Sequence, residues 1–151
     1  MTSPDTVPDT QATRAVIRRL EHAVNTRQPD LLVDIVTDDF VRHCEATPGV
    51  EVRTRGEFAD FLDQDLTVFP DSVQTFDHIL VDGDMAAVWA TYEGTQDGPM
   101  GPFPASGKTA RFWYSGIMRM EHGRIAEWWV TWDNMTILAQ LGHLGADAPN
   151  G

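Results

Sequence analysis

The chain has 151 residues and a net charge of −12, with 11 lysines and arginines against 23 aspartates and glutamates. This charge repels nucleic acid and anionic membrane surfaces, while the length and a hydrophobic fraction of 42% suit one domain with a real core. We expect a cytoplasmic protein, because no apolar run reaches the roughly 20 residues of a membrane helix, the first residues lack signal-peptide features, and Cys44 is the single cysteine.

The first half of the chain has the apolar spacing of helices. Residues 1–9 predict a disordered tail, and Asp9 or Thr10 can cap the helix that follows. Three helices are expected: one over about 10–26, a shorter one that follows Pro29 and is broken by Asp38-Asp39, and one over about 56–69 that ends before Pro70. Residues 40–45 predict a short extended piece between the second and third helices.

The second half changes to the period of two that is typical of strands. Four strands are expected, over 73–80, 86–94, 110–121 and 125–133. The Gly- and Pro-rich connection over 95–108 predicts a surface loop. A short closing helix follows from Asn134 to its stop at Gly142, and residues 143–151 predict a second tail. Helices followed by an antiparallel meander indicate an α+β domain whose twisted sheet leaves a conical hollow as the natural ligand site.

Asp133 stands where the last strand becomes the closing helix, behind three tryptophans. As a helix N-cap it would lower its own pKa, since the cap faces the positive end of the helix dipole. Lodged among indoles it would lose solvation and have its pKa raised, as in an aspartate that acts as a base near neutral pH. Composition leaves both interpretations open.

Two stretches, and a weaker third, carry a resemblance to a known family. The first is Gly94-Thr-Gln-Asp-Gly98 with Gly101-Pro-Phe-Pro-Ala-Ser-Gly-Lys108. The second runs from Ser115-Gly116-Ile117 through Gly123-Arg-Ile-Ala-Glu127 and Trp132-Asp133 to Gln140-Leu-Gly142, and the third is Phe40-Val-Arg-His43. With these motifs the sequence resembles the SnoaL-like polyketide cyclases of the NTF2-like superfamily over residues 10–142.

The resemblance implies an NTF2-like, cystatin-like cone with three N-terminal helices packed on a curved antiparallel sheet and a short C-terminal helix. It also implies a largely apolar pocket for a hydrophobic aromatic small molecule. The implied assembly is a homodimer or homotetramer that associates through the open sheet face. The implied reaction is a cofactor-free intramolecular aldol ring closure of an aromatic polyketide ester.

The resemblance further implies that Asp133 takes the proton, and His43 matches a family position at the pocket mouth, where it could relay a proton. There is one departure: many relatives carry His and Asp in the slots occupied here by Trp128 and Val130. The departure makes the pocket edge less polar or moves the proton-relay partner elsewhere.

Several aromatic residues and one arginine are candidate substrate contacts, although core packing or a surface ion pair is the ordinary alternative for each. They are Trp129, Trp113, Tyr114, Arg119, Trp132 and Trp89. Strand alternation places Trp129 on the same face as Asp133 if no bulge intervenes. No metal site is expected, because neighbours on an extended chain point to opposite faces, so His43, Cys44 and Glu45 cannot converge on one ion, and the other histidines form no cluster at metal spacing.

The leading hypothesis is a polyketide cyclase that uses Asp133 as acid and base. A second hypothesis is a cofactor-independent hydroxylase or another tailoring enzyme on the same fold, which the changed pocket edge favours. A third is a non-catalytic protein that binds a hydrophobic ligand, with Asp133 serving only as a cap.

Overall fold

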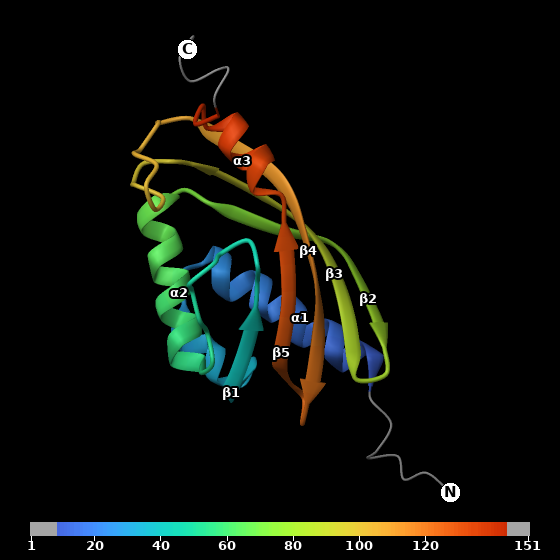
Figure 1. Cartoon of the computed structure of the whole chain (residues 1–151). Helices are drawn as coiled ribbons and strands as arrows, with labels where there is room; N and C mark the ends of the chain where they lie inside the picture. Colours follow the sequence, from blue (N-terminus) through green and yellow to red (C-terminus); the bar gives the residue numbers. More distant parts are fainter. Residues whose placement is uncertain (1–8, 145–151) are drawn as a thin grey trace, which may run out of the picture.

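A computed structural model describes residues 9–144 of the chain. Apart from their innermost residues, the predicted tails over 1–9 and 143–151 lie outside this range. The elements, in chain order, are α1 (Thr10–Asn25), the 3-10 helix η2 (Pro29–Asp34), β1 (Val36–His43), α2 (Arg55–Val68), β2 (Val73–Asp82), β3 (Met85–Thr95), β4 (Thr109–Glu121), β5 (Arg124–Trp132) and α3 (Asn134–Gln140). The α+β class is confirmed, and so is the curved sheet with helices on one side (Figure 1).

The helices begin where the sequence provides caps. The Asp9 carboxylate accepts hydrogen bonds from the backbone N–H groups of Gln11 and Ala12, at 2.9 and 3.2 Å. The Thr54 hydroxyl oxygen accepts one from Glu57 at the start of α2. Each cap satisfies backbone donors that the first helical turn leaves free.

The strand β1 differs from the prediction. The sequence predicts a helix up to Asp38-Asp39, but η2 ends at Asp34 and both aspartates lie exposed within β1. β1 pairs in parallel with β5, so the sheet has five strands in the order β1-β5-β4-β3-β2, and only its other pairings are antiparallel. The buried partners Val36 and Phe40 hold this charged segment in the sheet, so burial on one face overrides the low strand propensity of aspartate.

The helix α1 runs along the edge strand β2 and pairs with its free backbone groups. Three side chains of α1 donate to carbonyls of β2: Arg14 to Ile79 at 2.6 Å, Arg18 to Phe76 at 2.8 Å and Asn25 to Gln74 at 2.7 Å. In the other direction, the Phe76 N–H donates to the Glu21 carboxylate at 2.6 Å. The opposite side of α1 is solvated, while Ile17 and Leu20 are fully buried. The helix therefore covers both the sheet face and its edge.

Gly116 on β4 makes room for an indole from the neighbouring strand. A Cβ added there would lie 2.3 Å from the Trp128 Nε1 atom and 2.6 Å from the Trp129 carbonyl oxygen. Trp128 is buried, and within residues 9–144 its indole N–H has no hydrogen-bond partner. The position of this ring therefore depends on the absence of a side chain at residue 116.

We predict that Gly116→Ala lowers the free energy of unfolding by about 1–3 kcal/mol, because the ring or the strand must shift. Urea denaturation measures the change. Gly56→Ala in the first turn of α2 is the matched control, since its added Cβ would meet nothing closer than the Thr54 hydroxyl at 3.8 Å. The control should be neutral or slightly stabilising. Equal stability of the two variants would contradict the prediction.

Candidate functional site

A cavity of about 900 Å³ lies between the helices and the inner face of the sheet. Its volume falls within the range of pockets that enclose a small organic ligand. Its walls are mostly apolar, and they come from all three α-helices, all five strands, the segment between β1 and α2, and the loop after β3. The predicted hollow of the cone is thus present, and we call it the large cavity.

Strand alternation determines which side chains face the large cavity. Along β5, Trp128, Val130 and Trp132 line it, whereas Glu127, Trp129 and Thr131 have the opposite parity. β1 pairs with β5 such that Arg42 lies beside Trp128 and also lines the cavity, while His43 lies beside Trp129. We call the face that carries Trp129 the outer face of the sheet.

Asp65 is the least exposed of the acidic residues that line the large cavity, since Glu51, Glu57 and Asp60 on the same lining are exposed. Asp65 projects from α2, and one carboxylate oxygen accepts a hydrogen bond from the Tyr92 hydroxyl at 2.7 Å. Burial raises the pKa of Asp65 to about 6, although the Tyr92 hydrogen bond and the charges of Arg42 and Arg27 act in the opposite direction. A carboxylate with this pKa can both accept and return a proton near neutral pH.

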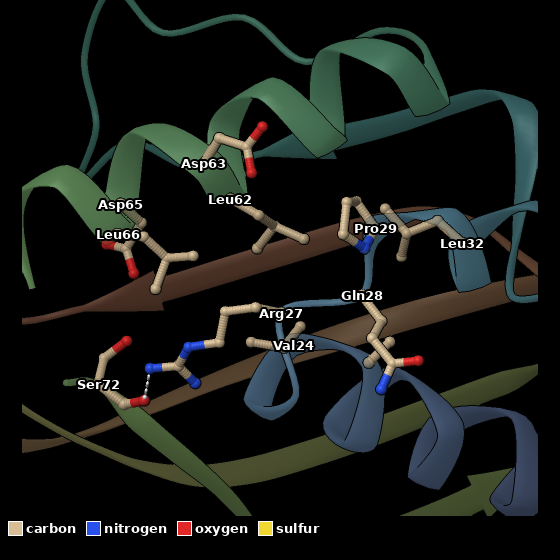
Figure 2. A pocket seen from close by; sticks show the side chains of 11 residues that line it. Val24, Arg27, Gln28, Pro29, Leu32, Leu62, Asp63, Asp65, Leu66 and Ser72 are labelled. Atoms are coloured by element: carbon tan, nitrogen blue, oxygen red, sulfur yellow. Dashed lines mark hydrogen bonds between the residues drawn. The ribbon is translucent and has the colours of Figure 1, made fainter. Parts of the chain in front are cut away.

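A second, small pocket lies behind Asp65, between the end of α1, η2 and α2 (Figure 2). Arg27 spans it and donates a hydrogen bond to the Ser72 carbonyl at 2.7 Å. Its volume is about 20 Å³, which suits a single water molecule rather than an organic ligand. Because Asp65, Val24 and Leu62 line both pockets, they form the partition between the small pocket and the large cavity.

Two further polar side chains on the inner face are buried. The Tyr114 hydroxyl donates a short hydrogen bond to the Gln74 amide oxygen, and burial raises the pKa of Tyr114 above its ordinary value. Burial lowers the pKa of Arg42, yet a guanidinium stays charged at neutral pH. Away from its exposed rim, the described lining thus holds one cation (Arg42), one acid (Asp65) and two phenols (Tyr92 and Tyr114) among mainly apolar side chains.

Asp133 lies outside the large cavity, which corrects the expectation that it is lodged among the tryptophans. Its side chain is exposed. One carboxylate oxygen accepts from the Met135 N–H at 2.9 Å and the other from the Thr136 hydroxyl at 3.0 Å, so both oxygens are used by the first turn of α3. The alternative that the sequence left open, a helix N-cap, is therefore what the structure shows.

The expected place of His43 at the pocket mouth is also wrong. His43 lies on the outer face, where its ring stacks on Trp129 with a centroid distance of 5.3 Å. Its Nε2 atom lies 2.6 Å from a Glu127 oxygen, and this hydrogen bond holds the pKa of Glu127 below its ordinary value. His43 and Asp133 therefore do not meet within the large cavity.

The six candidate substrate contacts divide between the two faces. Tyr114 and Trp132 line the large cavity as expected. Trp129, Trp113, Trp89 and Arg119 do not line it; the three tryptophans are 40%, 64% and 43% exposed on the outer face. Arg119 forms ion pairs with Glu121 at 3.0 Å and Glu127 at 3.2 Å, which is the surface pairing that the sequence offered as its alternative.

Asp65 and Arg42 are site residues that the sequence interpretation missed. Asp65 follows Phe61 by four positions and Leu62 by three, so it lies on the buried stripe of its helix. Arg42 follows Phe40 by two positions and shares its strand face. A charged residue in register with an apolar stripe was the available signal in both cases.

The loop between β3 and β4 forms part of the cavity wall through residues 99–103. Gln96 fixes this loop: its side-chain amide donates to the carbonyls of Gly98 and Phe103, at 3.1 and 3.2 Å, and its amide oxygen lies 2.7 Å from the His143 ring. The prediction of a loop is confirmed, and the loop also contributes to the site. No helix within residues 9–144 is long and apolar enough to cross a bilayer.

Comparison with known proteins agrees with this architecture. The family model described as SnoaL-like polyketide cyclase matches residues 14–141 of the chain. No curated protein matches the sequence significantly.

Solved structures give the same fold. TsrD from Streptomyces laurentii is similar over 91% of this chain and 99% of its own, with 25% identity and a TM-score of 0.81. IdmH from Streptomyces antibioticus, a suggested polyketide cyclase, is similar over 86% of this chain and 98% of its own, with 28% identity and a TM-score of 0.76. AclR from Streptomyces galilaeus, a suggested hydroxylase, is similar over 91% of this chain and 89% of its own, with 20% identity and a TM-score of 0.76. This similarity shows a shared fold.

The raised pKa of Asp65 predicts a specific pH dependence of stability. Between the ordinary value of 3.8 and the folded value of about 6, the folded protein binds this proton more tightly than the unfolded chain does. The free energy of unfolding therefore falls as pH rises through this window, by up to about 3 kcal/mol. Asp65→Asn cannot ionise, so it should gain stability relative to the wild type between pH 4 and 7.

Thermal or urea unfolding of both proteins across this pH range measures the difference. Asp63→Asn, on the exposed side of α2, controls for the loss of one negative charge from the helix. Wild-type and Asp65→Asn stability curves that run parallel from pH 4 to 7 would show that Asp65 has no raised pKa.

Proposed function

Because the chain belongs to the SnoaL-like polyketide cyclase family, we propose that it closes a ring in an aromatic polyketide by an intramolecular aldol addition. The reaction would need no cofactor and would belong to natural-product biosynthesis. The observation that carries the proposal is Asp65, an acid with a pKa of about 6 on the wall of a large apolar cavity. The cytoplasmic location expected from the composition stays a prediction.

In the proposed reaction Asp65 removes the proton from a carbon that is flanked by two carbonyl groups. The electron pair of the broken C–H bond forms an enolate, whose carbon then attacks a ketone carbon of the same molecule. The new C–C bond leaves an alkoxide, which takes the proton back from Asp65. The Tyr92 hydroxyl, at 2.7 Å, fixes the carboxylate in place and stabilises its ionised form.

The aromatic walls would hold the substrate in the folded shape that ring closure requires. Tyr114 and Trp132 line the cavity with their rings 6.5 Å apart and nearly perpendicular. A flat polyketide can stack on such surfaces, and fixing its reacting carbons close together supplies part of the rate enhancement.

A second candidate, a cofactor-independent hydroxylase, is favoured by one observation. Trp128 and Val130, which replace the His and Asp of many relatives, both face the large cavity. The departure therefore lies where it would alter the chemistry. A hydroxylase would consume oxygen with its substrate, whereas an aldol cyclase would not.

We predict that Asp65→Asn lowers the rate of ring closure by about 10²–10⁴-fold, because the proton acceptor is lost. The assay follows ring closure of an aromatic 1,3-dicarbonyl substrate by chromatography. It also follows deuterium exchange at the carbon between the carbonyls by NMR, with an oxygen electrode in the same vessel. Oxygen uptake that matches product formation would identify the hydroxylase instead.

Asp133→Asn is the matched control, since asparagine caps a helix as well as aspartate does, and it should keep the wild-type rate. Loss of turnover in Asp133→Asn together with full turnover in Asp65→Asn would reverse the assignment. It would then support the role that the family resemblance implies for Asp133 and His43. Tight ligand binding with no turnover in the wild type would support the non-catalytic binder.

We also propose that the protein is a homodimer, or a homotetramer built from such dimers, that associates through the outer face of the sheet. Trp89, Trp113, Ile117 and Trp129 are 40–64% exposed on this face. A cluster of large apolar side chains on adjacent strands is typical of an interaction surface. A second copy of the chain offers the same surface, so the contact can be self-complementary.

Trp113→Glu should convert the wild-type oligomer to a monomer, because it places a charge at the most exposed of these apolar side chains. Size-exclusion chromatography with light scattering measures the mass. Met135→Glu, at an exposed position on α3 that is 61% accessible, is the control and should leave the mass unchanged. A monomeric wild type would contradict the proposed assembly.

A further inference from the structure

Arg42 is a buried cation on the wall of the large cavity. Only 8% of the residue is exposed. Its guanidinium carbon lies 4.0 Å from the centre of the Phe61 ring and 5.6 Å from that of Trp132. The Arg42 backbone N–H bonds the Val52 carbonyl at 3.0 Å, which fixes this part of β1. The charge is thus held in one place between aromatic rings.

The charge of Arg42 lacks a bonded counter-ion. Among residues 9–144, no carboxylate oxygen lies within 4.0 Å of its guanidinium, although other arginines, including Arg55 and Arg119, have such partners. Its side-chain bond is a long one of 3.3 Å to the Thr47 hydroxyl. A guanidinium has five N–H donors, so most of its hydrogen-bonding capacity is unused.

The nearby acid does not fill this gap. Burial lowers the pKa of Arg42, and the neighbouring Cys44 side chain and then the negative charge of Asp65 raise it. However, Asp65 receives its own hydrogen bond from Tyr92. Stacking on aromatic rings compensates the charge only in part, and it covers the faces of the guanidinium rather than its N–H edges. A buried charge without a partner carries an uncompensated cost in desolvation free energy, which an oppositely charged ligand can offset by pairing with it.

We propose that Arg42 binds a carboxylate of the substrate, so that the large cavity selects an aromatic polyketide acid over the neutral ester that the family resemblance implies. The inference rests on the proposed function in taking the large cavity as the substrate site. Arg42 is the only lysine, arginine or histidine among the described residues that line this cavity. Two parallel N–H···O bonds from a guanidinium match the geometry of a carboxylate.

The overall charge of the protein makes this contact local rather than long-ranged. The chain carries a charge of −12, and the exposed Glu51, Glu57 and Asp60 lie on the cavity lining. An anion is therefore not drawn in by the field of the protein as a whole. Preference for an acid must come from direct contact with Arg42 inside the cavity, so it should disappear when this one side chain is changed.

The test compares the binding of two matched probes, anthraquinone-2-carboxylate and its methyl ester, to the full-length protein at pH 7. Quenching of tryptophan fluorescence reports binding, because Trp128 and Trp132 line the cavity. The wild type should bind the acid roughly 10- to 100-fold more tightly than the ester, as expected for a charge-assisted hydrogen bond. Arg42→Gln should abolish this preference while ester binding stays within about threefold, and Arg42→Lys should keep part of it.

Arg53→Gln is the control, because Arg53 is exposed and does not line the cavity; it should keep the wild-type preference. Equal binding of acid and ester by the wild type would overturn the proposal, and so would an undiminished preference in Arg42→Gln. If Arg42→Gln does not fold, the Arg42→Lys variant and the wild-type ratio decide. This test measures binding and not turnover. An acid preference that is also seen in Asp65→Asn would therefore support the role of Arg42 even if the proposed reaction proved wrong.

Discussion

The site depends on which alternate residues of β5 face the large cavity, and we call this choice the parity of β5. Successive side chains of a strand point to opposite faces, so a shift of one residue would exchange the cavity lining with the outer face. The parallel pairing with β1 fixes the parity, because Arg42 lies beside Trp128 and His43 beside Trp129. Gly116 accommodates the Trp128 ring from the other neighbouring strand. Three adjacent strands thus decide together which aromatic rings meet a ligand and which meet solvent.

The cavity keeps two opposite charges apart in an apolar surround. Asp65 is bonded to Tyr92, and Arg42 is stacked on Phe61, so neither charge is satisfied by the other. Burial shifts the pKa of each group toward its neutral form, which is the expected cost of removing a charge from water. Such a costly arrangement is typical of sites that a ligand completes. Trp128 and Val130 add apolar side chains to the same lining, so this pair stands out as its buried charged feature.

Periodicity and capping residues were enough to predict α1, α2, α3, the four antiparallel strands and the α+β class, but not the end of η2 at Asp34. β1 was missed in part because Asp38 and Asp39 break local patterns, and only the pairing with β5 stabilises them as strand. Alternation predicts Trp129 and Asp133 on one side, but a strand pattern does not reveal which side faces the helices; Trp129 lies on the outer face, and Asp133 lies beyond the strand as the N-cap of α3. Asp65 was overlooked because the stripe of α2 was assigned from its apolar members alone.

The hydrogen bonds between α1 and β2 have a consequence for how copies of this chain can meet. A bare edge strand is a template to which another strand can add, and this is the usual route to fibrous aggregates. Here Arg14, Arg18, Glu21 and Asn25 occupy the outward backbone groups of β2. At the opposite margin, β1 bridges to Val52 and exposes two aspartates. Both margins of the sheet therefore disfavour the addition of a sixth strand, which is the step that open-ended polymer growth along the sheet would need.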